Sequence, residues 1–176
     1  MGDGTCQGRK YNWTKVKKEF GENMETILTD EKDERFIQLS NELNDEYFNN
    51  IGEDALKYLD YNALEDPHVV LLVLNWENPI ACASYRIFDE ESVEIRRVYV
   101  KKRYRKKGIA YKLVKSLEKL AIENNFKYSY IETGTDNIAA INLYKKLGYE
   151  EIENFGFFKD DEICLCMKKE FKTLIG

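Results

Sequence analysis

The sequence predicts a single α/β domain built on a mixed β-sheet. Three strand-like apolar segments, at 69–74, 80–87 and 93–100, follow one another with only short polar turns between them, which is typical of an antiparallel meander. After them the apolar period changes to steps of three and four residues, which indicates a helix over about 109–121. The chain shows no repeats or linkers, and its 176 residues suit one domain.

Before the meander the sequence predicts one short strand and two helical segments. Residues 26–29 are strand-like, and 33–48 carry apolar side chains at helical spacing. These apolar positions are Phe36, Leu39, Leu43 and Tyr47. A second helical segment is expected after Gly52. Residues 1–23 are mostly polar, so we interpret them as an N-terminal extension of unknown role and assign the single domain to 24–176.

Beyond the helix the sequence alternates again between the two kinds of element. The pattern returns to strand at 128–133 and to helix at 137–147. Two further strand-like segments, 149–158 and 162–167, are expected to close the chain as a hairpin. This alternation after an antiparallel meander predicts a mixed sheet.

Composition and charge exclude several classes of protein. Apolar residues make up 43% of the chain and aromatic residues 13%, which argues for a folded globule although 34% of the residues are charged. No run of about 18 apolar residues occurs, so we expect no membrane span. The net charge of −5 argues against a protein that coats nucleic acid. The N-terminus lacks an apolar signal core, so we expect a cytoplasmic protein.

The cysteine and histidine content argues against a metal centre. The four cysteines are few and unevenly spaced, and Cys164 and Cys166 should share one face of a strand because they are two residues apart. The single histidine, His68, leaves too few ligands for a tetrahedral zinc site, and we interpret it as a loop residue. We therefore expect reduced cysteines and no bound metal.

One segment departs from the acidic average. Residues 101–107 carry six positive charges in seven residues, and they lie between the strand-like segment 93–100 and the helix that Gly108 opens. A helix N-terminus offers unpaired N–H groups and a partial positive charge, which suit phosphate, and glycine allows close backbone approach. Alone, the charge run would fit a solvated loop or a nucleic-acid patch. Its position predicts a pocket for a compact polyphosphate.

The residues at this helix start resemble a known signature. Arg105-Lys106-Lys107-Gly108-Ile109-Ala110 matches the R/Q-x-x-G-x-G/A motif of the GNAT superfamily of acyl-CoA-dependent N-acetyltransferases. Residues 94–100 look like the fourth strand of that family, and 137–149 resemble its second signature. The resemblance extends over about 80–167.

The resemblance implies a mostly antiparallel sheet of about seven strands flanked by helices, with the fourth and fifth strands splayed apart. It also implies acetyl-CoA as the cosubstrate. The pyrophosphate would bind main-chain N–H groups at the helix start, while the pantetheine would contact Asn137 and pair with the fourth strand as an added strand would. The implied cofactor-binding positions are Arg105, Lys106, Lys107, Gly108, Ile109 and Ala110 at the helix start, and Val98, Tyr99 and Val100 on the strand.

Two side chains are implied as catalytic. Tyr144 would be the general acid that protonates the departing CoA thiolate, because a phenol with a pKa of about 10 holds its proton at neutral pH. Glu94 is the candidate general base for the incoming ammonium. Two alternatives stay open. Tyr144 can also be interpreted as a packing residue of its helix, and Arg96 and Arg97 would make Glu94 structural if they pair with it. Glu132 is then the reserve base.

Together these residues predict an acetyl-CoA-dependent N-acetyltransferase that modifies a primary amine of a small molecule or peptide by direct attack in a ternary complex. We expect the acceptor site to be built from 33–62, the loops near Asp89 and the last hairpin, where residues 155–158 would either line the site or cap the core. The acidic remainder of the chain favours a cationic acceptor. The alternative is a non-catalytic acyl-CoA-binding sensor or interaction module of the same fold. Homodimers are frequent in the family, so a second copy is a further possible partner.

Overall fold

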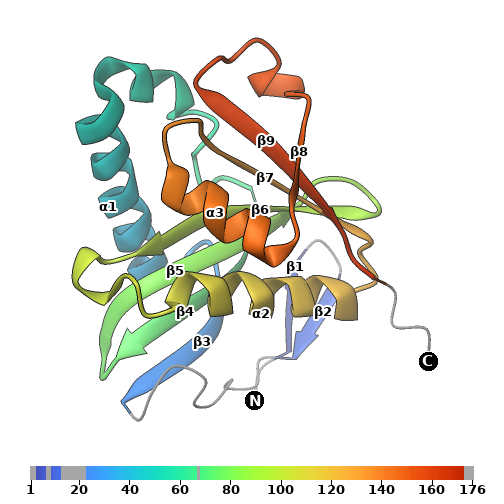
Figure 1. The fold of residues 1–176 in the computed structure, drawn as a ribbon. Helices are drawn as coiled ribbons and strands as arrows, with labels where there is room; N and C mark the ends of the chain where they lie inside the picture. The colour runs from blue at the N-terminus through green and yellow to red at the C-terminus, as the bar shows by residue number, and fades with distance from the viewer. Residues whose placement is uncertain (1–2, 7–8, 13–22, 67, 173–176) are drawn as a thin grey trace.

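A seven-stranded sheet forms the centre of the computed structural model, which describes residues 3–6, 9–12, 23–66 and 68–172 (Figure 1). In spatial order its strands are β3 (Met24–Asp30), β4 (Val69–Asn75), β5 (Asn78–Ile87), β6 (Ser92–Val100), β7 (Tyr128–Gly134), β9 (Cys164–Glu170) and β8 (Glu150–Ile152). Every neighbouring pair is antiparallel except β6 and β7, which are parallel. The mixed, mostly antiparallel sheet predicted from the sequence is thus confirmed.

The N-terminal part of the chain contains two additional short strands. β1 (Asp3–Cys6) and β2 (Arg9–Asn12) pair antiparallel as a separate two-stranded sheet. Most of the segment 1–23 lies outside the described residues, so its interpretation as an extension stays a prediction.

Helices cover the two faces of the large sheet. They are α1 (Glu34–Ile51), α2 (Ile109–Glu123) and α3 (Ile138–Leu147), with short 3₁₀ segments η1 (Gly52–Tyr58), η2 (Lys102–Tyr104) and η3 (Gly156–Phe158). Asp33 begins α1 by accepting a hydrogen bond from the Arg35 amide at 3.0 Å, as an N-cap does. The helical segment expected after Gly52 is the 3₁₀ helix η1.

Alternation along β4 explains how one sheet carries two apolar layers. Val69, Leu71 and Val73 belong to the core beneath α2 and α3, whereas the alternate residues of β4 pack with α1. These alternate residues are Val70, Leu72 and Leu74, which meet Phe36, Leu39 and Leu43 of α1. A strand that is apolar on both sides is therefore buried on both sides, as its continuous run of hydrophobic residues indicates.

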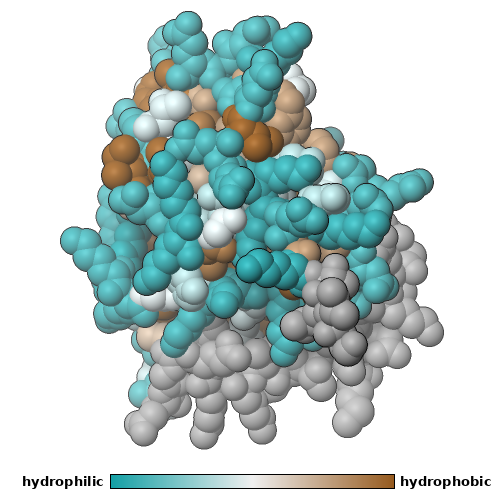
Figure 2. Space-filling model, turned by 45° about the vertical axis from the view of Figure 1, so that its right-hand side comes forward, coloured by the Kyte–Doolittle hydropathy of each residue, from teal (hydrophilic) through white to brown (hydrophobic). Residues whose placement is uncertain are grey.

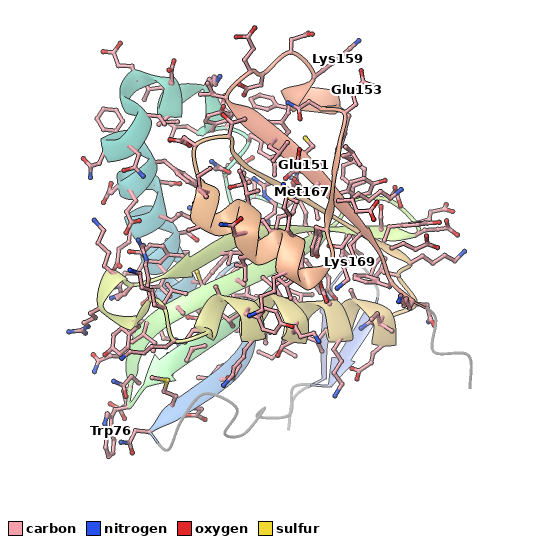
Figure 3. All side chains as sticks on the ribbon, viewed as in Figure 1. Trp76, Glu151, Glu153, Lys159, Met167 and Lys169 are labelled. Atoms are coloured by element: carbon pink, nitrogen blue, oxygen red, sulfur yellow. The ribbon has the colours of Figure 1, made fainter. Side chains whose placement is uncertain are left out.

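The expected meander is present, and its first turn is tight. β4 and β5 are joined through Trp76 and Glu77, with Asn75 and Asn78 directly paired. Trp76 has a positive φ of 54° and projects from the tip of this hairpin, with 71% of its surface exposed (Figure 3). This tryptophan lies away from the region where β6 and β7 part.

The last hairpin differs from the expectation in one respect. A strand over 149–158 was predicted, but β8 ends at Ile152 and the chain then passes through η3. The Asn154 side chain explains the change, because it makes hydrogen bonds that a continuing strand would have made. Its Nδ2 donates to the carbonyl of Cys164 at 2.8 Å, and its Oδ1 accepts from the amide of Cys166 at 3.0 Å.

β6 and β7 separate soon after they begin to pair. Their parallel pairing covers only Ser92–Glu94 of β6, although that strand continues to Val100. A bulge follows at Arg97, where φ is 53° and the pairing with β5 shifts register. The predicted splay of two neighbouring strands is confirmed, and Figure 1 shows β7, β8 and β9 turned away from the other strands.

The surface is charged and polar over most of the face shown in Figure 2, where the hydrophobic residues form small separate groups. Within the described part of the chain, none of the helices combines the length and the apolar character that a membrane span requires.

Candidate active site

The separation of β6 and β7 brings together polar side chains on the face of the sheet that α1 covers. Val93 and Ile95 belong to the core beneath α2, so alternation along β6 places Glu94 and Arg96 on the opposite side, where α1 lies. The bulge at Arg97 brings a second arginine to this side, where its guanidinium contacts α1. Three charged side chains of one strand are therefore buried beside the opening.

Glu94 is held by hydrogen bonds at both of its oxygens. Its Oε1 accepts from the Tyr61 hydroxyl and its Oε2 accepts from Nε of Arg86, while Nη1 of Arg96 lies 3.9 Å from Oε2. Arg86 also pairs with Asp66 at 2.6 Å. Because Glu94 has no exposed surface, these contacts replace the water that a carboxylate otherwise needs. Of the two arginines that would make Glu94 a structural residue, Arg96 thus lies near Glu94, whereas Arg97 binds residues of α1 instead.

Glu94 and Glu132 form a hydrogen-bonded carboxyl pair. Burial and the neighbouring charge of Glu94 raise the pKa of Glu132 well above its ordinary value. Burial also tends to raise the pKa of Glu94, but the Arg96 charge, hydrogen bonds from Glu132 and Tyr61, and the Arg86 charge together hold it below its ordinary value. The proton of the pair is therefore held more tightly by Glu132 than by Glu94.

Tyr144 reaches the same region from α3. The side chain is buried, and its ring meets the Tyr149 ring edge-on at a centroid distance of 6.0 Å. Burial, followed by the proximity of Tyr47 and Glu132, raises the pKa of the Tyr144 phenol above its ordinary value. The hydroxyl is thus protonated at neutral pH and lies near Glu132 of the carboxyl pair. Neither interpretation of Tyr144, as a general acid or as a packing residue, had required this proximity.

The basic loop leads into an uncapped helix start. Gly108 is the N-cap of α2 with φ of 75°, no side chain caps the helix, and the first helical bond runs from the Lys112 amide to the Gly108 carbonyl at 3.1 Å. Lys106 also has a positive φ, of 63°. A Cβ atom at Gly108 would meet no atom within 4 Å, so glycine is required here for its φ rather than for lack of space. The amides at this end are free to bind an anion.

Arg105 does not present its charge to that helix end. Its Nη2 lies 2.8 Å from both carboxylate oxygens of Glu46 on α1, and its Nε donates to the Val100 carbonyl at 2.7 Å. Lys106 and Lys107 are exposed. The arginine therefore fastens the loop to α1, and the full charges available to an anion come from the lysines.

The other predicted cofactor positions lie along the opening. Beyond Glu94, the edge of β6 that carries Val98, Tyr99 and Val100 has no strand partner on the β7 side among the described residues. Asn137 is the exposed N-cap of α3, where its Oδ1 accepts from the Ala140 amide at 3.2 Å. The unpaired edge of β6 and the side chain of Asn137 therefore keep hydrogen-bonding groups with which an extended ligand could pair.

The predicted acceptor elements are brought together by aromatic contacts. Tyr61, which follows η1, stacks on Phe157 with centroids 5.0 Å apart and meets Phe158 edge-on at 4.7 Å. Phe158 is buried in a small core with Cys164 and Cys166, whereas Phe157 is half exposed. Phe158 thus caps a core, as one interpretation of 155–158 expected, whereas Phe157 faces solvent. The other interpretation, that these residues line the acceptor site, stays a prediction.

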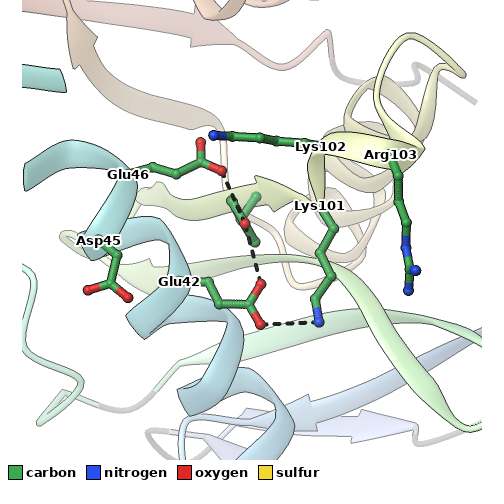
Figure 4. A pocket seen from close by; sticks show the side chains of 7 residues that line it. Glu42, Asp45, Glu46, Lys101, Lys102 and Arg103 are labelled. Atoms are coloured by element: carbon green, nitrogen blue, oxygen red, sulfur yellow. Dashed lines mark hydrogen bonds and ion pairs between the residues drawn. The ribbon is translucent and has the colours of Figure 1, made fainter. Parts of the chain in front are cut away.

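A pocket of 460 Å³ lies beside this region, between α1 and the end of β6 (Figure 4). Its acidic wall consists of Glu42, Asp45 and Glu46, and its basic wall of Lys101, Lys102 and Arg103. Glu42 pairs with Lys101 at 3.1 Å, and the Tyr99 hydroxyl lies 3.3 Å from Glu42 and 3.2 Å from Glu46. The two walls largely neutralise each other, and Glu94, Glu132 and Tyr144 are not part of the lining.

His68 lies on the same side as the charged cluster, but it is buried rather than in an exposed loop. Its Nδ1 is 3.0 Å from Oγ of Ser84, and its ring lies 6.3 Å from that of Phe36. Burial, followed by the charges of Arg96 and Arg86, lowers the pKa of His68 to about 3, so the ring is neutral. Within the part of the chain described, no three His, Cys, Asp or Glu side chains are grouped so as to hold a metal ion.

Three residues of the site were not anticipated from the sequence. Tyr61 and Tyr47 lie in segments without a recognisable motif, and Arg86 lies in a strand where an arginine near the end is unremarkable. Only the fold brings them to Glu94 and Arg97. The reserve candidate Glu132 was recognised by its position at the end of a strand, and it lies where that position implied.

Comparison with known proteins supports the same interpretation. Residues 36–149 match the model of the Acetyltransferase (GNAT) family. "Probable N-acetyltransferase HLS1" of Arabidopsis thaliana is 47% identical over 49 residues, which is 27% of this chain but only 12% of that protein's length. The match with this curated relative is thus confined to a small part of it.

Solved structures share the fold at low sequence identity. The PaiA N-acetyltransferase of Thermoplasma acidophilum, in complex with coenzyme A, superimposes with a TM-score of 0.68 and 17% identity over 85% of this chain and 100% of that chain. An acetyltransferase of the GNAT family from Staphylococcus aureus gives a TM-score of 0.63 and 20% identity, with coverage of 84% and 99%. Because the family model spans most of the sheet and its helices, this chain belongs to the GNAT family of acetyltransferases.

Proposed function

We propose that this protein transfers the acetyl group of acetyl-CoA to the amine nitrogen of a small molecule or peptide by direct attack in a ternary complex. The observation that carries the proposal is the opening between β6 and β7, beside which the buried Glu94 pairs with Glu132, while Tyr144 lies close enough to Glu132 for the two to interact electrostatically. A protonated phenol and a carboxyl pair that shares one proton are the groups that such a transfer needs.

The chain's own residues fit acetyl-CoA as the cosubstrate. The uncapped start of α2 suits the pyrophosphate, with the N–H groups from Lys106 to Ala110 as donors and with the Lys106 and Lys107 side chains nearby. The Arg105 amide, which was expected to join them, instead donates to the Lys102 carbonyl at 3.2 Å. The unpaired edge of β6 at 98–100 suits the amide groups of pantetheine, and Asn137 lies at the start of α3 to contact the same arm. Acetyl-CoA supplies the acetyl group as a thioester.

The carboxyl pair is proposed as the proton acceptor. Of its members, Glu94 is fully buried and bound at both oxygens, whereas Glu132 is only partly buried and lies near Tyr144. Once deprotonated, Glu132 takes a proton from the acceptor ammonium, and Glu94 tunes that step by raising the pKa of Glu132. A base with an elevated pKa is more effective near neutral pH than an ordinary carboxylate.

Tyr144 is proposed to act on the leaving group. Its hydroxyl donates a hydrogen bond to the sulfur as the C–S bond breaks, and main-chain N–H groups of Val98 to Val100 stabilise the negative charge on the carbonyl oxygen. Because the pKa of the phenol is raised, Tyr144 is a weak acid, so its main contribution is this hydrogen bond. The thiolate finally takes the phenolic proton, and the nitrogen returns a proton to Tyr144 when it loses its second proton to become the amide.

One experiment tests the proposal. Purified protein is mixed with acetyl-CoA and a panel of primary amines, and the release of free thiol is followed together with thermal stabilisation by acetyl-CoA alone. We expect stabilisation in the absence of an amine and thiol release with at least one amine. Stabilisation without turnover on a broad panel would favour the CoA-binding sensor, and the lack of any stabilisation would contradict the proposal.

A further inference from the structure

Arg97 is a buried arginine without a charged partner. Only 5% of its surface is exposed, and its Nη2 donates to the Ser40 carbonyl and, at 2.8 Å, to Oδ1 of Asn44 on α1. Among the described residues, neither its Nε nor its Nη1 has a hydrogen-bond partner, and no carboxylate pairs with it. Guanidinium groups stay charged in proteins, so this is an uncompensated positive charge in the interior.

Such an arrangement is unfavourable for the free protein. A buried charge is normally paired, and buried N–H groups normally find an acceptor. The backbone adds to the cost, because φ of 53° is strained for any residue other than glycine. Strained backbone and unsatisfied donors tend to occur where a ligand completes the site.

Arg96 points to the same conclusion from the neighbouring position. It is also more than nine-tenths buried, and its Nη2 binds the Tyr61 carbonyl and Oδ1 of Asn62. Its Nη1 has no hydrogen-bond partner among the described residues, and the carboxylate of Glu94 lies 3.9 Å away. Tyr47 lies close enough to feel both guanidinium charges. Two consecutive buried arginines therefore each keep donors that have no partner among the described residues.

The charge of the cluster makes an anion the appropriate ligand. Of the three arginines Arg86, Arg96 and Arg97, the first pairs with Asp66 and Glu94 and the second lies near Glu94, whereas Arg97 has no carboxylate partner among the described residues. The local charge is thus positive although the protein as a whole is acidic. This excess disfavours a purely cationic acceptor such as a polyamine, which the overall charge had suggested.

An anion bound by Arg97 would not be one of the CoA phosphates. The exposed start of α2 with Lys106 and Lys107 suits those phosphates, and α2 packs on the opposite face of the sheet from the one where Arg97 meets α1. Arg97 instead lies on the face where Glu94, Tyr61 and Glu132 are gathered. An anion bound there would be part of the molecule that supplies the amine.

We propose that the acceptor is a small amine that also carries a carboxylate, an amino-acid-like zwitterion, whose carboxylate binds the unused donors of Arg97 and Arg96. The inference rests on the proposed function, because it assigns the second substrate of that same site. The ammonium group of the acceptor then faces the Glu94–Glu132 pair, and the carboxylate neutralises the excess charge of the arginines.

The wild-type protein tests this with matched pairs of amines. Each amino acid of a panel is compared with the amine left when its carboxylate is removed, such as lysine with cadaverine and phenylalanine with phenethylamine. We expect kcat/KM, or affinity in the presence of CoA measured by calorimetry, to favour the carboxylate-bearing member by roughly 10- to 100-fold in at least one pair. Equal use or binding of both members throughout, or a preference for the decarboxylated amines, would overturn the inference and leave the proposed acetyl transfer standing.

Substitution of Arg97 tests the assignment of the residue. Arg97→Gln should reduce the preference within a pair to a few-fold or less, whereas Arg97→Lys should retain part of it and Lys119→Gln, at a 79% exposed position on α2, should leave it unchanged. Because the readout is a ratio, a general loss of active protein does not change it. An unaltered ratio in a folded Arg97→Gln protein would overturn the assignment. Binding of an amino acid with no acetyl transfer on the panel would support the anion site while contradicting the proposed function.

Discussion

The two ends of the site differ in how they are built. The start of α2 offers main-chain N–H groups of consecutive residues, and it is the left-handed φ of Gly108 there that favours a particular residue type. The opening between β6 and β7 instead depends on side chains from α1, the segment after η1, β5, β6, β7 and α3. We therefore expect substitutions at the opening to have large effects on the reaction and substitutions around the helix start to have small effects on cofactor binding.

The largest effect is expected for Glu132→Gln. The substitution keeps the size of the side chain but removes the proposed base, so kcat/KM at neutral pH should fall by about 10²- to 10⁴-fold. A pH–rate profile should also lose the limb that the raised pKa of Glu132 produces. Glu151→Gln, at a half-exposed position on β8, is the matched control (Figure 3). If Glu132→Gln kept both the rate and the limb, Glu132 would be excluded as the base.

Tyr144→Phe should have the next largest effect. Removal of the hydroxyl takes away the hydrogen bond to the leaving sulfur, so kcat should fall by roughly 10- to 10³-fold while thermal stabilisation by acetyl-CoA changes little. Tyr128→Phe removes a hydroxyl at the other end of β7, where β6 and β7 still pair, and serves as the control. An unchanged kcat with chemistry as the slow step would show that Tyr144 only packs on its helix.

Glu94→Gln should shift the pH profile rather than abolish activity. The Glu94 charge contributes to the raised pKa of Glu132, so its removal lowers that pKa, and the freed charges of Arg86 and Arg96 lower it further. The limb on which the rate rises with pH should therefore move to lower pH. A limb that stays in place would show that Glu94 does not act on the proton transfer, and a limb that disappears would make Glu94 itself the base.

The contrast between the two ends also explains what the sequence could predict. The helix start is a contiguous motif, so the order of the residues is enough to place Gly108 at the N-cap and the charges before it. The pairing of Glu94 on β6 with Glu132 on β7 depends on the face of its own strand that each residue takes, and the bulge at Arg97 changes which later residues of β6 share the face of Glu94. No local pattern predicts such a bulge, nor the length of β8, which the side chain of Asn154 limits.

The same reasoning applies to Arg105, whose role the contiguous motif did not reveal. The motif predicts a charge for the cofactor phosphates, but the partner of this arginine is Glu46, a residue 59 positions away on α1. Sequence spacing gives the position of a charge, whereas its partner is decided by packing. Lys106 and Lys107 beside it have exposed side chains, so they are the part of the motif whose charge is available to attract the cofactor phosphates.

Replacement of both Lys106 and Lys107 by Gln should produce the smallest effect. Both side chains are exposed, where screening limits each charge to about 1 kcal/mol or less, so KM for acetyl-CoA should rise only a few-fold at low salt and hardly at all at high salt. The main-chain donors of α2 are unaffected, and kcat should therefore stay the same. Lys119→Gln serves as the control for lost charge on α2. A large rise of KM that persists at high salt would mean that the cofactor end depends on side chains as much as the opening does.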